Sequence, residues 1–335
     1  MVISRKERVI KAFHGESVDR VPVGFWYHFL PEDELGQGLN NHTIFQKNLE
    51  GHRKFIKEVD PDFIKIMSDG FFTYPNPLIT TGVSSIQDLS EISSIGEDHP
   101  WFEQQVELVK AIKNSFTEDI VAIYNIFAPV TYLKWQLAGQ IASGDTFIAD
   151  FLHENAQILK RVLNTIASDI AILVRKIITE AKIDGIYLSV QSIQDDRVSD
   201  EDYRHYIAPS DLKILEAAHQ VDGVSVLHIC GYEGATNNIG FFKDYPAQVY
   251  NWAVKPEGVS LSKGRELFGG KPVLGGFVNT QEGVLYSGSK EEVQARVKEL
   301  LQEAGTRATI IGADCTIPSD IGAERIAWVK EAAAW

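Results

Sequence analysis

The feature that most constrains the fold is an alternation of short apolar segments with longer segments of helical pattern. The short segments are nearly continuous in apolar, β-branched and aromatic residues, as in parallel strands covered on both faces. Eight of them are expected to be strands: Val21–Phe25, Asp62–Met67, Ile120–Ile126, Gly185–Val190, Val224–Ile229, Gln248–Trp252, Pro272–Phe277 and Ala308–Gly312.

Helical patterns fill the gaps between these segments. A serine followed three residues later by an acidic residue is typical of a helix start. This pair occurs as Ser4 with Glu7, Ser199 with Asp202, and Ser289 with Glu292. The stretch Asp145–Lys182 is long enough for two helices, and Ile321–Ala334 is expected to form the last one.

Eight strands that alternate with helices predict a (β/α)8 TIM barrel, formed as a single domain by residues 1–335. An open doubly wound sheet is the alternative. That fold would place a glycine-rich phosphate loop after its first strand, whereas Gly24 is followed by Phe25, Trp26 and Tyr27. The sequence therefore favours the barrel.

The charge balance excludes several classes of partner. The chain has 32 basic and 46 acidic residues, which gives a net charge of −14. The sequence therefore does not favour the basic surface with which proteins bind nucleic acids and anionic membranes. No apolar run approaches the roughly 20 residues that span a bilayer, and the charged start Met1–Arg8 lacks the apolar stretch of a secretory signal. Two cysteines make no disulfide scaffold, which favours a reduced, cytoplasmic setting. An outer ring of helices could support a homodimer.

Three residues at predicted strand ends form a candidate zinc site. His228 and Cys230 are two positions apart in an extended segment, so their side chains point the same way, and Cys315 follows the last strand. Active sites of such barrels lie at the carboxyl ends of the strands. Zinc binds thiolates and imidazoles, and catalytic sites keep three protein ligands with one open position. The alternative is that the cysteines are small buried apolar residues.

Other strand ends supply further candidates. Asp69 follows the second strand, Gln191 the fourth and Asn279 the seventh. Gln191 and Asn279 are candidates for hydrogen bonds to a substrate, although such residues also cap helices. Tyr27 and Tyr132 could line an apolar substrate pocket or pack in the core. Glu233 and Asp314 are alternative metal ligands, or solvated acids.

Several segments together resemble the uroporphyrinogen decarboxylase superfamily, which includes zinc-dependent methyltransferases of the methylcobalamin:coenzyme M type. The resemblance covers nearly the whole chain. The segments that carry it are Asp19-Arg20-Val21-Pro22-Val23, Ile66-Met67-Ser68-Asp69, Ala128-Pro129-Val130-Thr131, Leu227-His228-Ile229-Cys230-Gly231 and Gly312-Ala313-Asp314-Cys315-Thr316-Ile317-Pro318.

Two differences separate the branches of this superfamily. Decarboxylases follow the first strand with an arginine-containing segment that binds substrate carboxylates, whereas residues 24–32 here contain no arginine. Decarboxylases also usually carry histidine where this chain has Cys315. The pattern His-x-Cys with a distant cysteine is that of the methyltransferases. The resemblance therefore implies that zinc, held by His228, Cys230 and Cys315, activates a small thiol, which receives a methyl group from a methylated corrinoid (methylcobalamin type) on a partner protein.

Two alternatives stay open from the sequence. One is a metal-free decarboxylase of porphyrin biosynthesis, in which the resemblance implies that Asp69 stabilises charge on the pyrrole. In a methyltransferase Asp69 would instead be a ligand of the resting-state zinc ion or a proton acceptor. A purely structural role for Asp69, as the cap of a helix or turn, is the alternative in both cases. The other alternative is a non-catalytic protein that binds a corrinoid or a metal.

Overall fold

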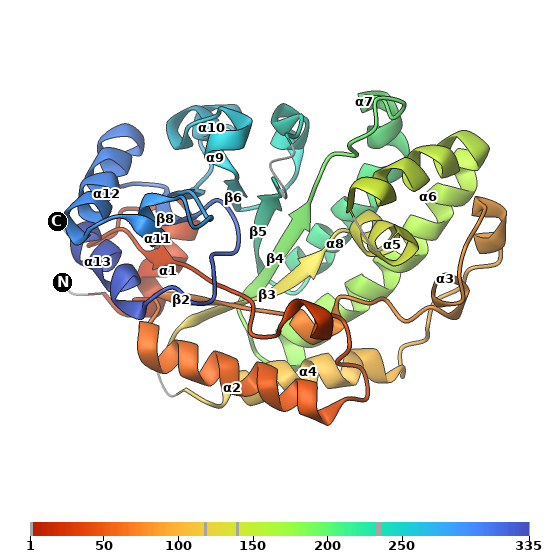
Figure 1. The fold of residues 1–335 in the computed structure, drawn as a ribbon, viewed down its shortest axis with the longest axis horizontal. Coiled ribbons are helices and arrows are strands. Elements are labelled where there is room, and N and C mark those ends of the chain that lie inside the picture. Colours follow the sequence, from red (N-terminus) through yellow and green to blue (C-terminus); the bar gives the residue numbers. More distant parts are fainter. Residues whose placement is uncertain (1–2, 117–118, 139–140, 232–235, 335) are drawn as a thin grey trace.

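The computed structural model describes residues 3–116, 119–138, 141–231 and 236–334. Eight parallel strands form one sheet in the order β1-β8-β7-β6-β5-β4-β3-β2, which curls into a nearly closed (β/α)8 barrel (Figure 1). The strands are β1 (Val23–Gly24), β2 (Phe63–Ile66), β3 (Val121–Phe127), β4 (Gly185–Val190), β5 (Val224–Ile229), β6 (Val249–Trp252), β7 (Val273–Phe277) and β8 (Thr309–Ala313). Each lies within two residues of a predicted strand, so the predicted fold is confirmed.

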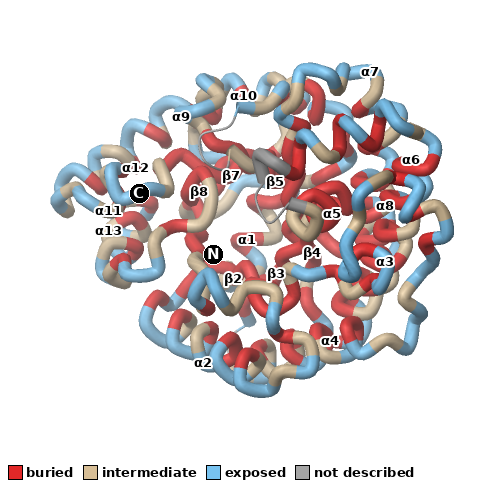
Figure 2. Tube along the Cα trace, turned by 45° about the vertical axis from the view of Figure 1, so that its right-hand side comes forward, coloured by how far each residue is buried: buried red, intermediate tan, exposed pale blue. Residues whose placement is uncertain are grey.

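Helices surround this sheet, with buried residues along the strands and exposed residues on the outer helix faces (Figure 2). They are α1 (Arg5–Phe13), α2 (His42–Val59), α3 (Pro77–Thr80), α4 (Pro100–Lys113), α5 (Pro129–Ala138), α6 (Ile141–Glu180), α7 (Asp200–Asp202), α8 (Ala208–His219), α9 (Val254–Glu257), α10 (Leu261–Leu267), α11 (Val284–Ser287), α12 (Lys290–Ala304) and α13 (Ala323–Ala333). Within the described ranges, none of them is long and apolar enough to cross a membrane.

The helix starts follow the predicted caps. Ser199 and Ser289 each form a reciprocal capping box, and the Ser4 hydroxyl accepts a hydrogen bond from the N–H of Glu7. The long predicted stretch is two helices, because α6 is broken at Asn155, whose φ of −163° and ψ of 92° are not helical. The side chain of Asn155 accepts a hydrogen bond from the N–H of Ile158 and so caps the second half.

The lower end of the barrel is closed by the first helix. Val9, Ala12 and Phe13 of α1 belong to one buried cluster with residues from the amino ends of the strands. The Phe13 and Phe63 rings meet edge to face at 5.6 Å. Gly24 is the residue of β1 that lets Phe63 fill this space, since a Cβ there would lie 2.1 Å from the Phe63 ring. Apolar side chains of α1 and of the strands therefore fill this end of the barrel.

Candidate metal centre

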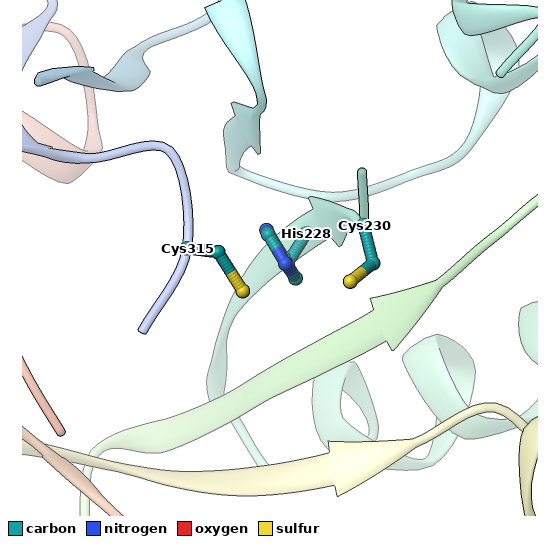
Figure 3. A group of neighbouring side chains, drawn as sticks. All are labelled: His228, Cys230 and Cys315. Atoms are coloured by element: carbon teal, nitrogen blue, oxygen red, sulfur yellow. The ribbon is translucent and has the colours of Figure 1, made fainter. Parts of the chain in front are cut away.

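The structure brings the three predicted zinc ligands together at the carboxyl ends of the strands. His228 lies near the end of β5, Cys230 follows that strand directly, and Cys315 lies in the loop after β8. Their side chains point toward one another (Figure 3), and one ligand atom from each lies within 4.8 Å of the other two. His228 is buried, whereas both cysteines are partly exposed and neither forms a disulfide.

Asn251 of β6 fixes the orientation of the His228 ring. The Nδ2 group of Asn251 donates to the carbonyls of Leu274 (2.8 Å) and Ala313 (3.1 Å), so its Oδ1 must act as the acceptor toward Nδ1 of His228, 2.6 Å away. Nδ1 therefore carries the proton and Nε2 has a lone pair. Nε2 is buried and has no hydrogen-bond partner among the described residues. A buried acceptor of this kind, held by a second residue, is what a metal-ligating histidine requires.

The electrostatics of the site favour thiolate. A hydrogen bond with Cys230 holds the pKa of Cys315 well below its usual range, and interactions with His228 and Lys65 lower it further, against the effect of burial. Two thiolates and a neutral imidazole are soft donors that zinc accepts. The residues present therefore fit a zinc ion, and their role as ligands stays a prediction.

Lys65 is a residue of this site that the sequence analysis missed. It lies on β2 and is 6% exposed, with its Nζ 3.9 Å from the centroid of the Tyr187 ring and 5.1 Å from that of Trp26. Burial lowers its pKa to about 8, although Cys315, Asp69 and Cys230 act in the opposite direction. A lysine inside the apolar run Phe63–Ile66 is the signal that could have revealed it.

A second buried lysine lies on the other side of the site. Nζ of Lys134, on α5, is 2.7 Å from Oδ1 of Asp145 and donates to Oε1 of Gln191 at 3.0 Å. Burial lowers the pKa of Lys134, whereas Asp145 and the nearby Cys230 raise it. Nε2 of Gln191 is buried without a partner among the described residues. Gln191, a predicted substrate-binding residue, thus presents an unused donor beside the metal centre.

Asp69, the predicted catalytic residue, lies at the same end of the barrel but outside the group of three candidate ligands. It begins a short 3-10 helix after β2 and is fully buried. Its carboxylate accepts hydrogen bonds from the N–H of Phe29 (2.7 Å) and, with the imidazole as donor, from Nδ1 of His28 (2.8 Å). Asp69 is therefore held in place by the chain that follows β1.

The remaining predicted residues are placed differently. Asn279 donates to the carbonyl of Thr316 at 3.1 Å and so tethers the loop that carries Cys315. The Tyr27 ring packs edge to face on Phe29 and on Phe55 of α2, and Tyr132 of α5 is buried among the rings of Trp101 and Phe127. Both tyrosines have aromatic packing partners, and their predicted pocket role is untested.

Of the two alternative ligands, only Asp314 lies in the part of the chain that the structure describes. Asp314 is 2% exposed and accepts hydrogen bonds from the N–H groups of Val254 and Lys255 at the start of α9. Burial nevertheless raises its pKa to about 7. Glu233 lies outside the described residues.

The protein is a (β/α)8 barrel with one imidazole and two thiols close together at the carboxyl ends of its strands. This candidate metal centre lies where barrel enzymes have their active sites. Comparison with protein families makes the class specific. The chain belongs to the uroporphyrinogen decarboxylase (URO-D) family, whose model matches residues 71–334. Members of this superfamily are enzymes. No curated protein sequence matches the chain.

Solved structures show the same fold. A methyltransferase from Methanosarcina mazei superposes with a TM-score of 0.72 at 17% identity, covering 98% of each chain. A putative vitamin-B12-independent methionine synthase from Listeria monocytogenes gives a TM-score of 0.56 at 14% identity, covering 95% of this chain and 98% of its own. A B12-independent methionine synthase from a Shewanella species gives 0.53 at 13% identity, covering 94% and 97%. At these identities the likeness concerns the fold.

Proposed function

We propose that the protein is a zinc-dependent methyltransferase that moves a methyl group from a methylated corrinoid, carried on a partner protein, to a thiol. The observation that carries this proposal is the approach of His228, Cys230 and Cys315 to within 4.8 Å, with the buried Nε2 of His228 left without a partner in the described chain. Membership of the URO-D family and the fold shared with a protein described as a methyltransferase support it.

His228, Cys230 and Cys315 would hold the ion and leave one position open to a substrate. When bound there, zinc would lower the pKa of a thiol, so that the thiol is a thiolate nucleophile at neutral pH. Asn251 keeps the proton of His228 on Nδ1, and Asn279 holds the loop that carries Cys315. These two residues help to fix the positions of candidate ligands that come from the ends of two different strands, β5 and β8.

Asp69 is proposed as the acceptor of the thiol proton. It is held by His28 and by the N–H of Phe29, and it faces the same buried lysine as the two cysteines, since Cys315, Asp69 and Cys230 all raise the pKa of Lys65. Gln191, through its unused Nε2 donor, is proposed to hold a polar group of the substrate. A cytoplasmic location and a homodimer remain proposals from composition and fold.

Metal analysis of the purified protein tests the proposal. We expect about one zinc per chain in the wild type and in the control Ser319→Ala, which changes an exposed residue of the same loop, and less than about a tenth as much in Cys315→Ala. Zinc-loaded protein should then transfer a methyl group from methylcobalamin to a small thiol such as coenzyme M. Absence of zinc after reducing, zinc-replete purification would overturn the metal site. Zinc without turnover on any methyl donor would favour a binding protein.

Decarboxylation of a porphyrinogen is the second candidate. The observation in its favour is the fully buried Asp69 at the mouth of a URO-D family barrel. Activity on uroporphyrinogen that survives chelation and is lost in Asp69→Asn would support it. The absence of arginine from residues 24–32 counts against it, because a substrate with many carboxylates needs cationic partners.

A further inference from the structure

A buried lysine, Lys65, lies on β2 near the metal centre. Lys65 is 6% exposed, and its ammonium lies over the face of the Tyr187 ring at 3.9 Å. No carboxylate lies within 4.0 Å of it among the described residues. Burial of an ammonium without a paired carboxylate is costly, so such a residue calls for a nearby anion.

Tyr187 connects this lysine to the metal centre. The Tyr187 ring also stacks with the ring of His228, with the two centroids 5.3 Å apart and the planes at 28°. The Tyr187 hydroxyl donates to Oδ1 of Asn251 at 2.7 Å, the same atom that accepts from His228. Lys65 is thus held one aromatic ring away from a proposed zinc ligand, by groups that cannot shift without disturbing that ligand.

The charged and titratable groups that face Lys65 are Asp69 after β2, Tyr187 on β4, and the two thiols after β5 and β8. Asp69 is occupied by hydrogen bonds from His28 and Phe29. Lys134 differs from Lys65, because its charge is already balanced by the fully buried Asp145 at 2.7 Å. Of these two lysines, Lys65 is the one with no carboxylate in ion-pair contact among the described residues.

The charge count shows what this ammonium can balance. A divalent zinc ion with two thiolates and a neutral imidazole sums to zero, so an added substrate thiolate leaves one negative charge on the metal centre. We propose that Lys65 is the counter-charge for that substrate thiolate, so that the centre prefers an anionic thiolate over a neutral ligand. This inference rests on the proposed function, and it assigns Lys65 a positioning role through charge rather than through contact with the substrate.

The inference is tested by ligand affinity in the cobalt(II)-substituted protein, where absorbance reports binding without turnover. The probes are 2-mercaptoethanol, which binds as a thiolate, and imidazole, which binds as a neutral ligand, both at pH 7. Lys65→Met should weaken thiol binding by at least about tenfold while imidazole binding changes by less than about twofold, because only the thiolate interacts with the lost charge. Lys65→Gln, which keeps a polar side chain beside the rings, is measured in parallel.

Lys271→Met is the matched control. Lys271 also lies over an aromatic ring, that of Tyr250 at 5.7 Å, but it precedes β7 at the opposite end of the barrel. Its substitution should leave both affinities unchanged. Equal loss of thiol and imidazole binding in both Lys65 variants, or no loss of either, would overturn the inference. If the wild type binds cobalt but no thiol, the proposed function fails instead.

Discussion

At the scale of single residues, Asn251 decides which nitrogen of His228 is available to a metal. Its amide donates twice, to Leu274 and Ala313, and its oxygen receives both the Tyr187 hydroxyl and the His228 ring. All four bonds are buried, so neither the amide nor the ring can turn without leaving a polar group unpaired. The orientation of the proposed zinc ligand is therefore set by a residue on the neighbouring strand.

Asn251→Ala should weaken zinc binding by about 10- to 100-fold, because the imidazole loses the partner that fixes its proton and its orientation. Competition with a chromophoric chelator measures this affinity. Asn125→Ala is the matched control: Asn125 is also a buried asparagine, on β3, but its amide donates to Oγ of Ser68 at 3.0 Å. Equal losses of affinity in the two variants would show that Asn251 acts only through stability.

The sequence predicted the three candidate ligands, which lie together in the structure, but not the residues that contact them. His228 and Cys230 could be predicted as a pair because alternate residues of a strand share a face. Cys315 could be predicted to join them because the carboxyl ends of all barrel strands converge. Lys65 and Asn251 depend on which strands are neighbours and at what register, as in the pairing of His228 with Asn251. Lys134 and Asp145 meet across two helices, and no spacing rule connects them.

At the scale of elements, the barrel has one seam, between β1 and β2. The other neighbouring strands are joined by ladders of paired residues, whereas β1 and β2 have no such ladder among the described residues. Side chains close the seam: Asp62 accepts a hydrogen bond from the N–H of Val23 at 2.9 Å and forms a two-pronged ion pair with Arg20. One carboxylate thus takes the place of strand pairing.

Arg20→Met should destabilise the fold by about 2 kcal/mol, because it leaves the carboxylate of Asp62, which is fully buried, without its cation. The free energy of unfolding from urea titration measures this. The control is Arg53→Met, which removes a guanidinium from an ion pair with Glu50 whose two side chains are 45% and 61% exposed. That change should stay within about 0.5 kcal/mol. A cost for Arg20→Met no larger than this would contradict the role of the seam.

The elements themselves were largely predictable. Strands were predictable because parallel strands buried on both faces need unbroken apolar runs, and each predicted strand overlaps an observed one. The short length of β1, Val23–Gly24, was not predictable. It follows from the missing ladder between β1 and β2 and not from the residues of β1 itself. The sequence predicted that this long stretch contains two helices, but it did not predict that they meet at Asn155.

At the scale of the whole molecule, polar groups continue outward from the metal centre through the layer of helices. The carbonyl of Gln191 accepts a hydrogen bond from the Tyr203 hydroxyl at 3.3 Å. Asp211 of α8 accepts from the Tyr245 hydroxyl (2.9 Å) and lies 3.4 Å from the Tyr203 hydroxyl, whose single proton is shared between this carboxyl group and the carbonyl of Gln191. Asp211 is fully buried, and no cation takes part in this hydrogen-bond network among the described residues. The network joins the strand ends to the outer helices, and its charge depends on pH through the carboxyl group of Asp211.

This buried carboxyl makes the stability of the protein depend on pH in a stated direction. Burial raises the pKa of Asp211 to about 7, whereas an aspartate in the unfolded chain titrates near about 3.9. Below about pH 4 the group is protonated in both states and costs nothing. As the pH rises from about 4 to 7 the unfolded chain releases a proton that the folded protein retains, so stability falls, and above about 7 the loss is complete.

Asp211→Asn removes this titration while keeping a side chain that the two hydroxyls can contact. We expect its melting temperature to exceed that of the wild type increasingly from about pH 4.5 to 8, corresponding to a gain on the order of 2 kcal/mol at pH 8 relative to pH 4.5. Scanning calorimetry at fixed scan rate over this range measures the difference. Asp98→Asn, at an exposed position, should follow the wild type throughout. A constant difference between Asp211→Asn and the wild type would mean that Asp211 contributes through packing alone, because only a group that changes its charge on unfolding can alter the slope of stability with pH.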